Sequence, residues 1–320
     1  MASLVANLVA GALPRLGLDP STAGGFESWL SSATIVPTHA LDSSSQRFDV
    51  GDLDSLVSFL SFDFERFSLA AAESFLRATE VPTGALNHAG WRLLELYYSA
   101  FFAAHAITRS QGAGVASITA ATARRVSEIA SLYDSAAAPF EPGMWFYRVR
   151  AGDDGTYVEF RQATTGSGVH DAFWREFCGF MQALAADAVQ SGLPDSAQFL
   201  AGAEEIAINI RTGGVGSGSW LAKIRNEINY KHAHDTWYPE PRRQVATSAL
   251  SEIRLKPSES IRLDRSKSKE PLSAFANTCG YLTALSFELS DYIAARSTKG
   301  AAFGQKWRRF ADLTKLVMPG

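Results

Sequence analysis

The stretch "NHAGWRLLELYYSAFFAAHAITRSQG", residues 87–112, decides the fold class of this chain. Its apolar positions cover almost the whole circumference of a helix instead of forming one stripe. A helix of that kind is buried on all sides and therefore belongs in the middle of a helical bundle. Gly112 follows the last helical turn, at a position where glycine commonly ends a helix. The stretch predicts a mainly α fold built around one central helix.

Most other segments also show helical spacing, with apolar residues three and four positions apart. The expected helices are 1–17, 52–60, 64–79, 117–130, 171–190, 195–210, one that begins near Ser219, 272–296 and 305–317. We expect three regions along the chain. They are an N-terminal helical region (1–80), a helical bundle (81–240), and a basic connection followed by C-terminal helices that pack on the bundle (241–320).

One segment breaks the helical pattern. Residues 144–165, "MWFYRVRAGDDGTYVEFRQATT", are rich in aromatic and β-branched side chains and contain Asp154-Gly155 in the middle. This combination predicts a β-hairpin, which would be a small insertion in the bundle. The basic, serine-rich residues 242–271 predict an exposed loop with at most a short strand or two.

The composition is that of a globular protein. Of the 320 residues, 46% are hydrophobic and 20% are charged, which excludes a disordered chain. Charge is unevenly distributed. Residues 1–220 hold 13 Lys/Arg and 23 Asp/Glu (13 − 23 = −10), and residues 221–320 hold 17 and 10 (17 − 10 = +7). Either the C-terminal third faces an anionic partner such as RNA, or the opposite charges neutralise each other within one fold.

Cysteine usage and hydropathy indicate the compartment. Cys178 and Cys279 are the only cysteines, and no CxxC motif is present, so a reducing environment is expected. The N-terminal segment is apolar but lacks a basic region, and no apolar run is long enough to cross a bilayer. We therefore expect a cytoplasmic protein without membrane contact.

The polar run "IRNEINYKHAHDTWY", residues 224–238, holds the candidate functional residues. It continues the buried stripe to which Leu221 belongs. We place the run on a helical wheel at 100° per residue, with Leu221 at 0°. Relative to that leucine, Arg225 lies at about 40°, His232 at about 20° and Asn229 at about 80°. An arginine on the edge of a buried stripe needs an anionic partner or a polar cleft.

Three interpretations of this run stay open from the residues alone. Arg225 could form a salt bridge with a carboxylate on a neighbouring helix, with His232 as an ordinary helix-end residue. Alternatively, Arg225 could bind a phosphate and His232 could transfer a proton, because their Cα atoms would lie about 10 Å apart and no metal is needed. A metal site at His232, His234 and Asp235 is disfavoured, because the two histidines would lie about 200° apart on a helix.

The glycine-rich loop at residues 213–219, "GGVGSGS", resembles a nucleotide-binding loop only loosely. A Walker loop needs a lysine after its last glycine, and here Ser219 follows Gly218. The G-x-G-x-x-G spacing also fails, because Ser219 stands three positions after Gly216. A flexible connector with a serine N-cap is the favoured interpretation.

Two segments together resemble the HEPN domain family. "RNEINYKH", Arg225 to His232, is similar to the R-x(4–6)-H signature of that family, with six intervening residues, the long end of its range. "WRLLELYYSAFFAAHAITRSQG", residues 91–112, resembles the family's aromatic- and alanine-rich core helix. The order of the two helices along the chain, with the core helix before the signature helix, is also similar to that of the family. The resemblance covers roughly residues 85–240 and implies a HEPN-like helical bundle.

The resemblance implies a metal-independent endoribonuclease that needs no cofactor and acts as a homodimer whose two signature helices share a cleft. Arg225 would stabilise the charged phosphorane-like transition state, and His232 would act as general base or acid. Asn226 would orient the site or bond to the phosphate. The products would carry a 2′,3′-cyclic phosphate and a 5′-hydroxyl. Such proteins often serve as toxins, with an antitoxin, or as effectors with partner proteins in bacterial defence against phage.

The chain also departs from the family pattern. In one toxin branch a tyrosine two residues after the signature histidine is modified by a partner nucleotidyltransferase, but here that position is His234. This histidine is thus a second candidate for proton transfer, and Asn229 is a further polar candidate. RNA contacts are expected from the basic residues Lys231, Arg254, Lys256, Arg262, Arg265, Lys267 and Lys269. A non-catalytic HEPN-like binding or regulatory subunit is the alternative, and an unrelated helical protein with a structural arginine is a third.

Overall fold

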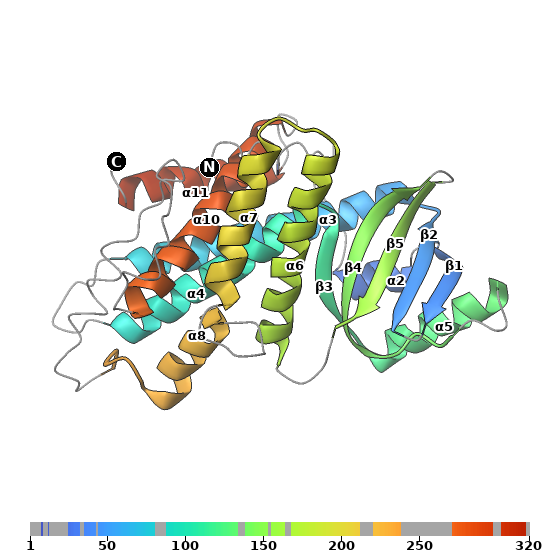
Figure 1. Cartoon of the computed structure of the whole chain (residues 1–320), viewed down its shortest axis with the longest axis horizontal. Coiled ribbons are helices and arrows are strands. Elements are labelled where there is room, and N and C mark those ends of the chain that lie inside the picture. Colours follow the sequence, from blue (N-terminus) through green and yellow to red (C-terminus); the bar gives the residue numbers. More distant parts are fainter. Residues whose placement is uncertain are drawn as a thin grey trace.

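The computed structural model describes residues 8, 12, 25–32, 35–42, 44–80, 88–133, 138–152, 155–163, 168–211, 220–237, 271–296 and 302–317. This part of the chain is mostly helical and also contains one antiparallel sheet. Most helices gather at one end of the molecule, and the sheet lies at the other (Figure 1). The predicted mainly α fold class is thereby confirmed at this coarse level.

Apart from the helix at residues 26–32, for which no helical segment was predicted, the described helices follow the predicted segments. They are α2 (Phe26–Ser32), α3 (Leu53–Thr79), α4 (Ala89–Ser110), α5 (Ala120–Tyr133), α6 (Val169–Gln190), α7 (Ser196–Arg211), α8 (Trp220–Lys231), α10 (Pro271–Arg296) and α11 (Ala302–Val317). The segments 52–60 and 64–79, expected as two helices, form the single helix α3, because Ser61 and Asp63 are buried within it.

Helix α4 is the central element, as its sequence predicts. Of its 22 residues, 17 are buried. It packs against α3 and α10, and α6 and α8 also contact it. In Figure 1, α4 runs behind α6, α7 and α10, so that helices enclose it. Burial on all sides explains why this helix can be apolar around its whole circumference.

The sheet has five strands in the order β1-β2-β5-β4-β3, and every neighbouring pair is antiparallel. The strands are β1 (Ile35–Asp42), β2 (Ser45–Val50), β3 (Ala113–Ile118), β4 (Gly143–Gly152) and β5 (Gly155–Gln162). The predicted hairpin is β4–β5, whose last pair joins Gly152 to Gly155. The ring of Tyr147, on β4, stacks on the ring of Phe26 of α2, and the two ring centroids are 4.4 Å apart. Helix α5 lies beside β1 (Figure 1).

The sheet is larger than the hairpin that the sequence predicts, and this expectation is corrected. β1 and β2 lie within residues 1–80, which were expected to be helical, and β3 precedes α5 where a helix from residue 117 was expected. β1 contains Pro37, β2 offers few apolar residues, and β3, "AGVASI", is built mainly of small ones. β2 and β3 lack the β-branched and aromatic enrichment that marks a strand in sequence, and in β1 the β-branched residues Ile35, Val36 and Thr38 are interrupted by Pro37.

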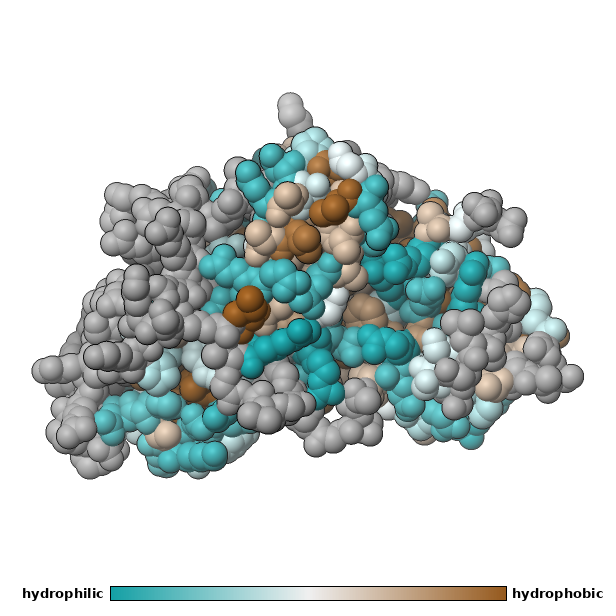
Figure 2. Space-filling view, viewed as in Figure 1, coloured by the Kyte–Doolittle hydropathy of each residue, from teal (hydrophilic) through white to brown (hydrophobic). Residues whose placement is uncertain are grey.

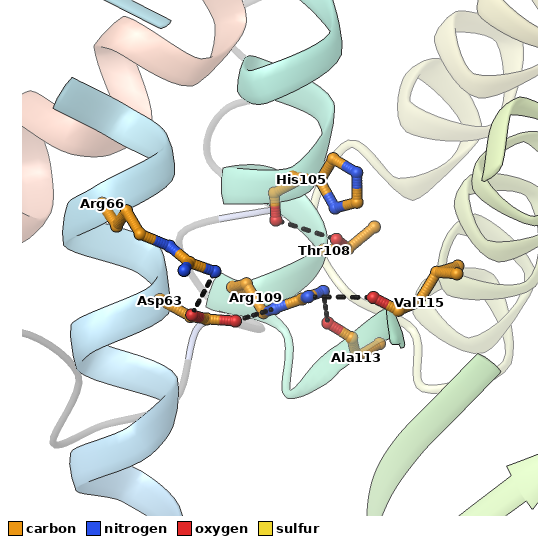
Figure 3. Close-up of polar contacts among 7 residues, drawn as sticks. All are labelled: Asp63, Arg66, His105, Thr108, Arg109, Ala113 and Val115. Atoms are coloured by element: carbon orange, nitrogen blue, oxygen red, sulfur yellow. Dashed lines mark hydrogen bonds and ion pairs between the residues drawn. The ribbon is translucent and has the colours of Figure 1, made fainter. Parts of the chain in front are cut away.

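A buried arginine ties the bundle to the sheet (Figure 3). Arg109, near the end of α4, is only 2% exposed. Its Nε donates to Oδ2 of Asp63 on α3 at 3.1 Å. Its two terminal nitrogens donate to the carbonyl oxygens of Ala113 (3.2 Å) and Val115 (3.1 Å) on β3. Because Arg109 joins α3, α4 and β3, it fixes the first strand that follows the central helix.

Several sequence predictions fall outside the described residues. They are the glycine-rich loop 213–219, the basic connection 242–271 except for its last residue, and nearly all of the expected first helix. The candidate RNA-binding residues Arg254, Lys256, Arg262, Arg265, Lys267 and Lys269 lie in that connection. Among the described helices, none is both long and apolar enough to cross a bilayer.

Candidate functional site

Helix α8 carries the candidate residues and is held by its apolar stripe. Leu221, Ile224 and Ile228 are at most 3% exposed. They recur at three- and four-residue spacing, and α8 packs against α4 and α7. This packing confirms the buried stripe that the sequence predicts. Arg225 follows Ile224 and lies half-buried at the edge of the stripe.

Arg225 has neutral partners. One terminal nitrogen donates to the hydroxyl oxygen of Tyr98 on α4, and the other donates to Oδ1 of Asn226 at 2.8 Å. The guanidinium carbon lies 5.5 Å from the ring centroids of both Tyr98 and Tyr230. The Nε atom is buried and has no hydrogen-bond partner in the described part of the chain.

The charge of Arg225 is therefore uncompensated by any carboxylate within the described residues. The described residues therefore do not include the salt bridge between Arg225 and a carboxylate of a neighbouring helix that the sequence left open. Partial burial lowers the pKa of Arg225, but the hydroxyl groups of Tyr98 and Tyr230 raise it, and the pKa lies above the ordinary value. The guanidinium is a permanent cation at the surface of the bundle, and its planar set of donors is suited to an anion.

A polar chain that sequence reasoning missed lies next to Arg225. Trp174 Nε1 donates to the hydroxyl oxygen of Tyr97 at 3.1 Å, and this hydroxyl lies 3.0 Å from Nδ1 of His170. Which of Tyr97 and His170 donates in this bond depends on the tautomer of the imidazole, since the tyrosine hydroxyl can either donate or accept. The rings of Tyr98 and His170 are 6.0 Å apart. No sequence motif joins these residues; they meet because α4, α6 and α8 converge.

His170 is neutral near pH 7. Burial, and after it the positive charge of Arg225, lower its pKa to about 4. The buried ring of His105 stacks between Phe67 and Phe173, with centroids 4.6 Å and 3.8 Å away. Burial also lowers the pKa of His105 well below its usual range.

The free energy of unfolding should fall as the pH drops from about 6.5 towards about 4. Over this window the unfolded chain binds protons at His105 and His170 more readily than the folded chain, because both folded pKa values are lowered. Urea titrations at a series of pH values measure the slope. The variant His170→Gln should show a shallower slope than the wild type; an unchanged slope would contradict the assignment of His170.

His232 lies beyond the end of α8 and not along its buried edge. Its φ angle is 51°, in the left-handed region, and its side chain is exposed. The backbone N–H of Ala233 turns back to the carbonyl of Glu227 at 3.1 Å, and Trp237 Nε1 donates to the carbonyl of Ile228 at 2.7 Å. These bonds cap the helix, so the wheel position expected for His232 is wrong.

The remaining sequence candidates have separate environments. His234 Nε2 lies 3.0 Å from Oε2 of Glu227, whereas the ring of His232 faces Trp237 at 6.0 Å. The two histidines thus have different partners, and neither lies in a strand. No group of three His, Cys, Asp or Glu residues suited to a metal ion occurs within the described ranges. Asn229 is half-buried, and Lys231 is exposed at the end of α8.

The structure thus brings Arg225 and Asn226 together and adds Tyr98, Tyr97 and His170 to them. His232 follows the last residue of α8, whereas Arg225 lies in the middle of that helix; the ring of His232 faces Trp237, and no described contact joins it to Arg225. A scan against protein-family models and searches of curated proteins and of solved structures gave no match for this chain.

Proposed function

We propose that this chain is a metal-independent endoribonuclease of the HEPN type. The observation that carries the proposal is the guanidinium of Arg225, half-buried at a helix edge with neutral partners and no carboxylate among the described residues. Such a cation is suited to a phosphodiester, which supplies the missing negative charge. The R-x(4–6)-H resemblance of residues 225–232 supports the same chemistry.

Arg225 acts on the phosphate in this proposal. The Tyr98 hydroxyl and the Asn226 amide hold the planar guanidinium in a fixed direction. A preorganised cation stabilises the extra negative charge of the pentacoordinate transition state without reorganising during the reaction. Asn226 is exposed, so its amide nitrogen is free to donate to a phosphate oxygen.

His232 moves the protons in this proposal. Neutral imidazole removes the proton from the 2′-hydroxyl, whose oxygen attacks the adjacent phosphorus, while the bond to the 5′-oxygen breaks. The imidazolium formed in this step then donates its proton to the departing 5′-oxygen, which returns His232 to its neutral form. The products are a 2′,3′-cyclic phosphate and a 5′-hydroxyl. His232 is preferred over His234 because it is exposed, whereas His234 is bonded to Glu227.

We also propose a homodimer, an RNA-contacting residue and a biological role for this protein. A homodimer would bring two copies of α8 to a shared cleft and place a second Arg225 and His232 within reach of one RNA strand. Lys231, exposed beside the site, would contact the RNA backbone. The biological role proposed is that of a cytoplasmic toxin or effector in bacterial defence against phage, controlled by an antitoxin or another defence-system protein.

The second candidate is a non-catalytic HEPN-like binding or regulatory subunit. The orientation of His232 favours it, because this ring faces Trp237 and the backbone leaves the helix at that residue. Such a subunit would use Arg225 to bind an anion without cleaving it.

Cleavage of a single-stranded RNA in EDTA distinguishes the two candidates. The nuclease proposal predicts chelator-resistant cleavage and fragments whose masses correspond to 2′,3′-cyclic phosphate and 5′-hydroxyl ends. RNA binding without cleavage would favour the regulatory subunit. Fragments that carry 5′-phosphate ends would overturn the mechanism, because 2′-hydroxyl attack cannot produce them.

A further inference from the structure

A pocket of about 310 Å³ lies between α6 and the face of the sheet opposite to the core. It is separate from the Arg225 site, since its lining residues come from β2, β4, β5 and α6. Figure 2 shows mainly hydrophilic residues over β4 and β5, the side of the sheet that this view presents. The volume is in the range of sites for small ligands, which start at about 300 Å³.

Small residues of α6 keep this pocket open. Gly179 and Ala183, four residues apart on one face of α6, both line it. A Cβ atom added at Gly179 would meet no heavy atom within 4 Å, so the space in front of this glycine is empty. A larger residue at position 179 would extend into the pocket.

Aromatic rings form part of the pocket wall. Phe146 of β4 and Phe180 of α6 line it, with ring centroids 6.4 Å apart and planes inclined by 57°. Phe180 is 4% exposed, so its position is fixed and only a small part of its ring faces the pocket, whereas Phe146 is half-buried. Such rings accept a flat aromatic ligand by stacking or by edge contact.

Two arginines of β4 give the pocket a cationic end. Arg148 and Arg150 are two positions apart and therefore point to the same face of the sheet. Both pair with Asp187, Arg148 at 2.9 Å and Arg150 at 3.8 Å, and Arg150 also lies 3.5 Å from Glu159. The Arg150 distances are longer than the about 2.7–2.9 Å of a strong charged hydrogen bond.

Because Arg148 and Arg150 share the carboxylate of Asp187, their guanidinium groups can also bind another anion. Burial, and then repulsion by the nearby charge of Arg150, lower the pKa of Arg148, while its hydrogen bond to Asp187 and the charges of Asp187 and Glu159 raise it. A bound phosphate would bridge both guanidinium groups and relieve this repulsion. Elsewhere in the pocket Arg161 already has both terminal nitrogens bonded to the carboxylate of Glu176.

We infer that this pocket binds a nucleoside monophosphate, with its phosphate between Arg148 and Arg150 and its base against Phe146 and Phe180. The pocket joins a partly aromatic wall to two arginines that share the carboxylate of Asp187, within the volume of one such ligand. Ser45 and Glu159, also in the lining, offer a hydroxyl and a carboxylate to the polar edge of the base or to the ribose.

Titration calorimetry of the full chain with AMP, GMP, CMP and UMP tests this inference. At least one of them should bind with a Kd below about 1 mM, and more tightly than its nucleoside or inorganic phosphate alone. Failure of all four to bind would overturn the inference. Equal affinity for inorganic phosphate would overturn it as well, because the aromatic wall would then contribute nothing.

Three variants locate the binding. Gly179→Leu should abolish binding, since its side chain occupies the pocket, yet it should fold, because leucine favours a helix more than glycine does. Arg150→Gln should weaken binding by about tenfold or more, the worth of a charge-assisted hydrogen bond. Arg47→Gln is the control, because Arg47 is on the same face of the sheet, stacked on Tyr157, and outside the pocket lining. Binding by Gly179→Leu at wild-type affinity, with an unchanged thermal midpoint, would contradict the inference.

Discussion

Replacement of Arg109 with leucine should lower the free energy of unfolding by about 3–5 kcal/mol, the cost of removing one partner from a buried ion pair. Arg109 is 2% exposed and donates to Asp63 and to two carbonyl oxygens of β3. Leucine fills part of the volume but leaves the buried Asp63 with fewer donors. Urea denaturation followed by circular dichroism measures the change.

Arg66→Leu is the matched control for Arg109→Leu. Arg66 pairs with the other oxygen of the same carboxylate, Asp63 Oδ1, at 2.8 Å, but its side chain is 53% exposed (Figure 3). Solvent screens an exposed pair, so this variant should cost at most about 1 kcal/mol. Equal losses for the two arginines would contradict the role assigned to burial. Gly114→Ala should also be destabilising, because its Cβ would collide with the Arg109 guanidinium.

Replacement of His232 with asparagine should reduce RNA cleavage by about 10²- to 10⁴-fold, the usual contribution of a general acid–base group. Asparagine is the informative substitution because His232 has a φ angle of 51°. Asparagine tolerates this left-handed conformation, whereas alanine would add backbone strain. The side chain is exposed, so the stability should change by no more than about 0.5 kcal/mol. Initial rates on a fluorescent RNA, with a thermal melt of each protein, provide both measurements.

His234→Gln is the control for His232→Asn. It removes the bond to Glu227 but leaves His232 in place, so we expect its cleavage rate to stay within about tenfold of the wild-type rate, less than the loss of a general base. The reverse pattern, with cleavage lost in His234→Gln and kept in His232→Asn, would assign the proton transfer to His234.

The helical part of the fold can be predicted from the sequence because its apolar periodicity is strong. α4 is apolar all round and is buried all round, and the β4–β5 hairpin forms where aromatic residues flank Asp154-Gly155. β2 and β3 cannot be predicted in this way. β3 consists mainly of small residues and is buried by its neighbours, so its strand conformation depends on contacts distant in sequence.

The candidate site could be predicted only in part. The helical wheel places Arg225 at the edge of the buried stripe, and the structure finds it half-buried there. The wheel fails at His232, because the helix ends at Lys231 and a histidine takes the left-handed position more typical of glycine or asparagine. Tyr98 and His170 join the site through the packing of α4 and α6, which no local pattern encodes.

The uncompensated charge of Arg225 connects the fold to the proposed chemistry. α4 supplies Tyr98, α8 supplies Asn226, and both are neutral, so the bundle orients the guanidinium without neutralising it. A structural arginine in this position would more commonly meet a carboxylate, as Arg109 does in the same protein.

The most direct measurement is the rate of RNA cleavage in EDTA for the wild type, Arg225→Gln and Lys223→Gln, each verified as folded by its thermal midpoint. Lys223 is the control because it is an exposed cation on the same helix. Removing one preorganised donor to the transition state should slow cleavage by about 10²- to 10³-fold in Arg225→Gln, while Lys223→Gln stays close to the wild-type rate. Cleavage by folded Arg225→Gln at the wild-type rate, or no cleavage by the wild type, would contradict the proposed role of Arg225.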